Sequence, residues 1–306
     1  MIFQRLIWSA LGAAVLVGSV QSGVQHWQAV PIILAAEAFE AQKLEAAVAP
    51  VAATPATVAV TPHAHAKGVA PEHEHAAVPA QATVQEPVKA QEQEQAKAHD
   101  HGAAQEWTPA NGSERVFWTW LATVLHAFSM ALLVFAVMGV CLWRGTAMRS
   151  LPLGLLVAAA GWLSFHFWPS LGLPAEIPGM DAARLGSRQG WWVLAAGSAA
   201  LACASVAGLR SHLRWAAAAA WLAVPFVVGA PSMAADPLAG FSGSAQLQLR
   251  ELGTQFIWAT TWVSLSFWVL MGLVCSAAFK RWLRPVLEKS FKSLQSNAST
   301  GMAANS

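Results

Sequence analysis

Residues 116–142 read VFWTWLATVLHAFSMALLVFAVMGVCL and contain no Asp, Glu, Lys or Arg. Such a run is long enough for a helix that crosses the hydrocarbon core of a bilayer, which takes about 20 residues. Charged residues make up 11% of the whole chain, whereas an average soluble protein has about 25%. Further apolar segments lie near 6–35, 151–171, 190–209, 215–234 and 254–279. The sequence therefore predicts an all-α membrane protein, a polytopic helical bundle of about six spans.

The basic residues of the short connections predict the orientation of this bundle. They fall in alternate connections: Arg5, Arg144, Arg149, Arg210, Arg214, Lys280, Arg281, Arg284, Lys289 and Lys292. Because Lys and Arg are enriched on the cytoplasmic side of a membrane, we expect both termini in the cytoplasm. The connections 36–112, 172–189 and 235–253, which contain carboxylates, then lie on the outer side.

The first apolar segment has a second interpretation. Residues 1–20, with Arg5 before an apolar core, resemble a secretory signal peptide, and its cleavage would leave five spans in the same orientation. The apolar character resumes at 30–34, which a cleaved signal does not need, and this favours a retained helix. The chain then divides into a first transmembrane helix (1–35), a disordered His-rich extracytoplasmic loop (36–112), a five-helix membrane bundle (113–284) and a cytoplasmic tail (285–306).

Several classes of function find no support in the sequence. It has no GxxxxGK[ST] or GxGxxG motif, so nothing in the sequence indicates nucleotide hydrolysis. Its three cysteines, Cys141, Cys203 and Cys275, lie in or beside apolar segments and give neither a C-x-x-C site nor a disulfide framework. A net charge of +2 does not favour a nucleic acid partner. The spans hold no carboxylate to accompany a nucleophile and a base, so we expect a protein that is not an enzyme.

The long connection after the first span is rich in histidine. Six of the ten histidines form three His-x-His pairs: His63 and His65, His73 and His75, and His99 and His101. On an extended chain both histidines of a pair point to the same face, so a pair with a neighbouring carboxylate supplies most of a site for a divalent transition metal. We expect residues 41–106 to be disordered without metal and to collect ions, because their composition cannot bury a core. The alternative is a solvated spacer.

Polar side chains inside the apolar segments suggest where an ion passes the membrane, since such groups are costly there. Gln21, Gln25 and Gln28 share one stripe of the first span. His26, His166 and His126 descend from the outer side toward mid-depth of three spans, an order that suits an ion path from outside. The alternative for each of these residues is hydrogen bonding between helices.

Four phrases of the sequence occur together in one family. They are Gln21-x-x-x-Gln25 followed by VPIILAAE (30–37), LGLPAEIPGM (171–180), LGSRQGWW (185–192) and GAP (229–231). With the histidine-rich connection after the first span, they resemble the CbtA family of proposed bacterial cobalt transporter subunits. The resemblance implies uptake of Co²⁺ across the inner membrane for cobalamin biosynthesis, together with a small single-span, histidine-containing partner subunit. We expect no tightly bound cofactor, because the metal is the cargo, and the ligand types alone allow Ni²⁺ or Zn²⁺ as well.

The sequence also departs from the family, which often has a histidine after the proline of the fifth span, where this chain has Phe226 after Pro225. The family is commonly described with five spans. Beside the shared phrases, Glu37 and Glu176 predict an acidic vestibule above the glutamine stripe, and the alternative is that Arg188 pairs with one of them. Membrane lipid is the other expected partner, and the oligomeric state is open. The rival functions are a membrane-anchored metal sensor or buffer and an assembly subunit that does not itself transport.

Overall fold

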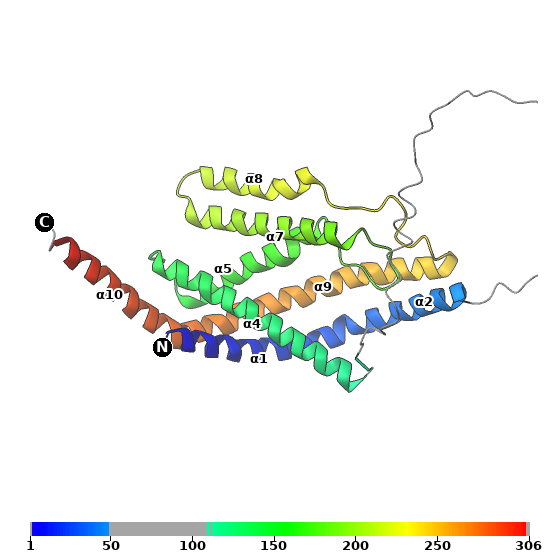
Figure 1. Cartoon of the computed structure of the whole chain (residues 1–306), viewed down its shortest axis with the longest axis horizontal. Coiled ribbons are helices and arrows are strands. Elements are labelled where there is room, and N and C mark those ends of the chain that lie inside the picture. The colour runs from blue at the N-terminus through cyan, green and yellow to red at the C-terminus, as the bar shows by residue number, and fades with distance from the viewer. Residues whose placement is uncertain (1, 49–108, 111, 304–306) are drawn as a thin grey trace, which may run out of the picture. The chain divides into compact units, whose positions relative to one another are not determined.

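The computed structural model describes residues 2–48, 109–110 and 112–303, and this part of the chain is helical without a strand (Figure 1). The elements are α1 (Ile2–Gln28), α2 (Val30–Val48), α4 (Ser113–Trp143), α5 (Ser150–Trp162), the π-helical turn η1 (Leu163–Phe167), α6 (Trp168–Ser170), α7 (Leu185–Gly208), α8 (Leu213–Val228), α9 (Gly243–Ala278), the π-helical turn η2 (Phe279–Leu283) and α10 (Arg284–Ala303). The all-α fold class is confirmed.

Five helices of the described chain are long and apolar enough to cross a membrane: Ile2–Gln28, Ser113–Trp143, Ser150–Ser170, Leu185–Gly208 and Gly243–Ser293. The segment expected at 215–234 is the shorter helix α8, whose 16 residues extend ~24 Å. It ends at Val228 because Gly229 has a φ of 86°, outside the helical region, and Pro231 follows. The expected end of this segment at residue 234 was therefore wrong.

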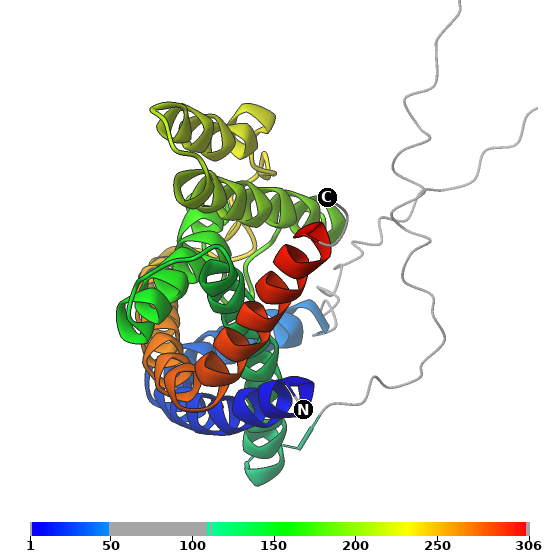
Figure 2. The ribbon, with the colours of Figure 1, turned by 90° about the vertical axis from the view of Figure 1, so that its left-hand side faces the viewer.

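Although it is short, α8 returns the chain along α7, and the two helices lie side by side in both views (Figures 1 and 2). The indole Nε1 of Trp191, near the start of α7, donates to the carbonyl of Pro225, near the end of α8, at 3.0 Å. Trp168 Nε1 likewise donates to the carbonyl of Leu222 at 3.2 Å. The described chain therefore runs between the two ends of the bundle six times, with five of the passes made by long helices and one by α8.

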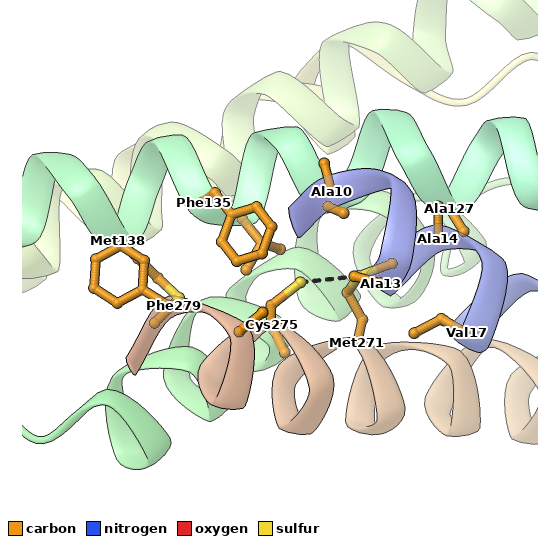
Figure 3. Close-up of a cluster of buried hydrophobic side chains, with 14 of the residues drawn as sticks. Ala10, Ala13, Ala14, Val17, Ala127, Phe135, Met138, Met271, Cys275 and Phe279 are labelled. Atoms are coloured by element: carbon orange, nitrogen blue, oxygen red, sulfur yellow. Dashed lines mark hydrogen bonds between the residues drawn. The ribbon is translucent and has the colours of Figure 1, made fainter. Parts of the chain in front are cut away.

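Small residues allow the first helix to pack closely in the core. Ala10, Ala13 and Ala14 of α1 are at most 3% exposed, and Figure 3 shows this part of α1 between α4 and α9. A Cβ added at Gly18 would lie 2.8 Å from the Cα of Val124 in α4, so the two backbones touch there. Small residues at such crossings are how membrane helices gain contact without a hydrophobic driving force.

Small residues also allow α5 to pack closely against α9. A Cβ at Gly154 would overlap the hydroxyl of Ser276, and a Cβ at Gly161 would overlap the indole ring of Trp268. On the other side of the crossing, a Cβ at Gly272 would lie 2.8 Å from the Cβ of Ala158. The pair is thus fixed by glycines at the contact, and α9 is held against α1 and α5 at once.

A second, smaller apolar cluster lies at the end of the bundle where α1 meets α2. Ala36 of α2, Ile177, Leu238 and Leu249 of α9 are buried in it, and Phe39 packs against them. Because this cluster buries one face of α2, the chain continues as a helix through Val48. The loop was expected to begin at residue 36, and in the structure residues 36–48 are helical instead.

The opposite end of the bundle gathers the basic connections. Arg284 Nη1 donates to the carbonyl of Met148 at 3.3 Å, and a Cβ at Gly208 would lie 3.5 Å from Arg144 Nη1. The ends of α4 and α7 and the start of α10 therefore lie together. The segment expected as a tail from residue 285 is helical as far as Ala303, continuing from η2.

Candidate functional site: polar contacts along helix α9

The strongest polar contact inside the bundle is made by Gln21. Positions 10, 14, 17 and 21 share a face of α1 by helical spacing, and this face is buried. Gln21 itself is 3% exposed, and its Nε2 donates to the carbonyl of Val263 in α9 at 2.8 Å. Ser266 Oγ donates to Gln21 Oε1 at 3.4 Å and to the Val263 carbonyl at 2.8 Å. One residue of the predicted stripe thus joins the first membrane helix to the last.

The other two glutamines of the stripe have different surroundings. Gln25 is half-buried, and its Oε1 accepts a hydrogen bond from Thr123 Oγ1 of α4 at 3.4 Å. Gln28 is also half-buried, and its Oε1 is inaccessible with no hydrogen-bond partner within the described residues. A neighbouring contact joins α4 to α1, since Trp120 Nε1 donates to Ser19 Oγ at 3.0 Å. The glutamine stripe therefore borders α4 as well as α9.

His166 lies in the π-helical turn η1, half-buried. Its Nε2 is 3.4 Å from Thr261 Oγ1 of α9, and that hydroxyl donates to the carbonyl of Ile257 at 2.8 Å. The ring of Trp162 lies 6.1 Å from the imidazole by centroids, and the indole Nε1 of Trp162 is inaccessible without an acceptor among the described atoms. π-helical turns are rare and often occur at functional sites.

The remaining two membrane histidines lie at exposed positions. The ring of His126 in α4 is 5.4 Å by centroids from Phe267 of α9, and one side of it is open. His26 in α1 is exposed too, beside Trp27, which is 81% exposed. Neither side chain has a hydrogen-bond partner within the described chain. His126 nevertheless rests against a residue of the buried core, since Phe267 belongs to it.

The predicted site residues converge on one stretch of α9 without forming one cluster. His166 contacts Thr261, and Gln21 contacts the carbonyl of Val263. The ring of His126 lies against Phe267. Thr261 and Val263 are two positions apart, about 200° around the helix, so His166 and Gln21 lie on opposite sides of α9. Within the part of the chain that the structure describes, no three His, Cys, Asp or Glu side chains come together as a metal-holding group.

The two carboxylates expected to form a vestibule are each held by an arginine. Glu37 Oε1 of α2 accepts from Arg115 Nη2 of α4 at 2.8 Å, and Glu176 Oε2 lies 2.5 Å from Arg188 Nη2 of α7. Of the two interpretations of Glu176, the structure has the pairing with Arg188. Electrostatically this end of the bundle is therefore a set of ion pairs that link α2 to α4 and the 171–184 connection to α7.

Sequence reasoning missed several of these partners. Thr123, Thr261, Ser266 and Arg115 were not singled out, and neither was a third ion pair, in which Arg250 Nη2 lies 2.6 Å from Asp236 Oδ2. A signal for two of them was present: residues 260–267 read TTWVSLSF, a hydroxyl-rich stretch within an apolar segment. The partner of Glu37 had no such signal because Arg115 is 78 residues away along the chain.

The predicted ligands of the long connection, His63, His65, His73, His75, His99 and His101, lie outside the described residues. Their role stays a prediction. At the position where the resembling family often has a histidine, Phe226 lies edge-on to two tryptophans, with ring centroids 5.4 Å from Trp168 and 6.1 Å from Trp191. Position 226 is therefore surrounded by aromatic rings, and its phenylalanine side chain cannot bind a metal ion.

Comparison with protein-family models gives one match over residues 80–280, to CbtA, described as "Probable cobalt transporter subunit". The matched range covers more than half of the chain and includes the helices from α4 to α9, whereas α1 and its glutamines lie before it. No curated protein and no solved structure matches the chain.

Proposed function

Because this chain belongs to the CbtA family of probable cobalt transporter subunits, we propose that it carries a divalent transition metal inward across the bacterial inner membrane. Cobalt is the first candidate for the cargo, destined for cobalamin biosynthesis, and Ni²⁺ or Zn²⁺ are the alternatives. The observation that carries the proposal is the polar stretch of α9, along which hydroxyl and carbonyl groups of α9 contact the amide of Gln21 from α1 and the imidazole of His166 from η1, while the ring of His126 from α4 lies against Phe267. Polar groups at membrane depth are typical of substrate and ion pathways.

In this proposal the chain works in three stages. The histidine pairs of the long connection collect ions on the outer side, and the carboxylates Glu37 and Glu176 guide them when released from their arginines. Gln21, Gln25 and the hydroxyls of α9 then replace part of the hydration shell of the ion. The imidazoles of His26, His166 and His126 are borderline ligands suited to cobalt, and each provides a single ligand at its position.

A partner subunit fits this incomplete set of ligands. Within the described chain no group of three potential ligands is assembled, and His126 and His26 are exposed. A small single-span partner with its own histidines would add ligands beside them. The proposal needs a driving force from elsewhere, because the sequence has no nucleotide motif. A membrane potential supplies about 2.3 kcal/mol per charge per 100 mV, and proton coupling or the partner are the other sources.

The rival functions predict different behaviour. A membrane-anchored sensor or buffer would bind metal through the long connection and would not change the metal content of the cell. Its weakness is that one span suffices to hold a loop, whereas this chain has five long helices of spanning length and a shorter sixth. An assembly subunit would raise uptake only together with its partner, even when every polar residue of the bundle is removed.

The decisive experiment is metal accumulation in cells that express this chain alone or together with a small histidine-containing partner. Cells that express neither protein give the background. We expect cobalt uptake above background when both are present. No uptake of cobalt, nickel or zinc under either condition would contradict transport. Uptake that persists after Gln21 and His126 are both replaced by Leu would favour the assembly subunit.

Deletion of residues 60–102 tests the collecting role of the histidine pairs. If they concentrate scarce ions, uptake fails at low external metal and recovers at high metal. Loss at every concentration would instead make the connection part of the path. A control variant, in which the six loop histidines are replaced by Gln and the length is kept, separates ligand loss from loop shortening.

A further inference from the structure

The two ends of the bundle differ in how many of their basic side chains contact a carboxylate. At the outer end Arg115, Arg188 and Arg250 each contact a carboxylate, whereas Arg184 contacts none among the described residues. At the opposite end the described carboxylate is Glu288, and it is bound to Arg284 at 2.7 Å. The other cations there are Arg5, Arg144, Arg149, Arg210, Arg214, Lys280, Arg281, Lys289 and Lys292. This end therefore has an excess of positive charge that the described part of the protein does not neutralise.

Arg144 occupies a defined position within this basic end. It follows the last residue of α4, and its guanidinium reaches the end of α7, where a Cβ on Gly208 would lie 3.5 Å from Nη1 and 4.0 Å from Nη2. Arg210 follows Gly208 by two residues and adds a second positive charge to the same corner. The side chain of Arg144 is exposed, and no carboxylate contacts it among the residues of known position.

Beside this guanidinium the surface is hollowed. A shallow, largely open hollow there is lined by Val140, Trp143 and Arg144. Val140 is 52% exposed and Trp143 is 65% exposed, so the wall is apolar while the rim is cationic. Trp143 is the last residue of a spanning helix, which is where tryptophan marks the boundary between hydrocarbon and headgroups. The hollow thus combines an apolar wall and a positive rim at the end of a helix of membrane-spanning length.

We propose that this hollow is a binding site for an anionic phospholipid. The phosphate lies on the guanidinium of Arg144 with Arg210 adding to the field, and the upper part of an acyl chain lies along Val140 and Trp143. Arg is suited to this role because its planar guanidinium binds phosphate through two hydrogen bonds. A free phosphate ion would use the rim and leave the apolar wall unused, so the lipid fits the whole surface. The site is independent of which metal the bundle carries.

Arg144 also lies where a cation stabilises a helix C-terminus, and this gives a competing role for it. In that role Arg144 would affect the stability of α4 and α7 and leave lipid binding unchanged. Lipid affinity and thermal stability, measured on the same variants, therefore separate the two.

The test uses the full chain in nanodiscs of phosphatidylcholine, titrated with phosphatidylglycerol and followed by native mass spectrometry. Arg144→Gln should weaken binding of the tightest phosphatidylglycerol about fivefold, since a basic residue near an anionic surface contributes on the order of 1 kcal/mol. Arg149→Gln is the matched control, because Arg149 is exposed in the same connection and does not line the hollow. Its binding should stay within about twofold of the parent chain.

Three outcomes would overturn the proposal: equal loss in both variants, which would mean a diffuse field; unchanged binding in Arg144→Gln; or displacement of the lipid by millimolar inorganic phosphate, which would mean a site for the free anion. If Arg144→Gln melts early, Arg144→Lys keeps the charge and gives the comparison. Lipid binding by Arg144→Lys that exceeds binding by a folded Arg144→Ala supports the site, and equal binding by the two contradicts it.

Discussion

The side-chain amide of Gln21 donates to the backbone carbonyl of Val263 across 2.8 Å and so joins the first membrane helix to the last. The same carbonyl accepts from Ser266 Oγ, which also contacts the amide oxygen of Gln21. Three polar groups therefore satisfy one another beside buried apolar side chains such as Val17 and Phe267. Such a contact stabilises the bundle whether or not an ion passes it, and the two roles have separate measurements.

Replacement of Gln21 by Leu tests the structural role. The free energy of unfolding should fall by about 1 kcal/mol, because hydrogen bonds between membrane helices contribute roughly 0.6–1.7 kcal/mol. Gln4→Leu is the control, since Gln4 is exposed in the same helix. Thermal unfolding in detergent measures the difference. A Gln21→Leu protein as stable as the parent chain would show that the hydrogen bond contributes nothing net, and a loss of uptake in that stable protein would assign Gln21 to the path.

The crossing of α5 and α9 predicts a contrast between two glycines. Gly161→Ala places a methyl group where the indole of Trp268 lies, and overpacking of this kind costs about 1–3 kcal/mol. Gly197→Ala adds the same methyl group to α7, where no heavy atom lies within 4 Å. Because Ala favours a helix over Gly, Gly197→Ala should leave the melting temperature unchanged or raise it. Equal melting of the two variants would mean that α5 and α9 do not cross at Gly161.

The pair of Glu176 and Arg188 predicts a small coupling energy. Both side chains are about a quarter exposed, at 28% and 26%, and ion pairs that solvent reaches contribute at most about 1 kcal/mol. A double-mutant cycle of Glu176→Gln and Arg188→Gln, measured by unfolding at low and high salt, gives the value. The coupling should shrink as salt rises. A coupling well above 1 kcal/mol that is insensitive to salt would mean that this pair is shielded from water in the folded protein.

Replacement of a histidine by Ala should affect uptake in the membrane spans but not in the connection between α7 and α8. His126→Ala and His166→Ala should each lower cobalt accumulation severalfold while the amount of protein in the membrane is unchanged. His212→Ala is the control, because His212 is exposed in the basic connection between α7 and α8. Uptake by the first two variants equal to that of His212→Ala would assign both imidazoles to packing.

Much of the fold follows from hydrophobicity, because spanning helices must be long and apolar in order to satisfy their backbone inside lipid. The segments around 116–142 and 151–171 appear in the structure nearly where they were expected. The bounds of α2 and α8 were not predictable in the same way. α2 extends to Val48 because Ala36 and Phe39 pack against residues distant in sequence, and α8 stops early at the left-handed conformation of Gly229.

The candidate site was predictable in part. The glutamine stripe was visible as a spacing on one helix, but its partner is the backbone carbonyl of Val263, which carries no side-chain signature. The sequence allows either an open acidic vestibule or a pairing of Glu176 with Arg188, and the structure has the pairing because the 171–184 connection brings the two side chains together. The contact of His166 with Thr261 depends on the widened turn η1, which helical periodicity does not anticipate.

The number of residues in the widened turn η1 determines the direction of the side chains that follow it in the third span. A π-helical turn holds one residue more than an α-helical turn, so every side chain after Phe167 is rotated by about 100° from the direction that a regular helix would give it. Trp168 reaches the carbonyl of Leu222 from this rotated position. Loss of a single residue between Leu163 and Phe167 would turn the indole away from α8, even though the remaining sequence would look equally suited to the membrane. The attachment of α8 to the bundle therefore depends on the number of residues in this turn, and a change of one residue there should disrupt it more than most substitutions nearby.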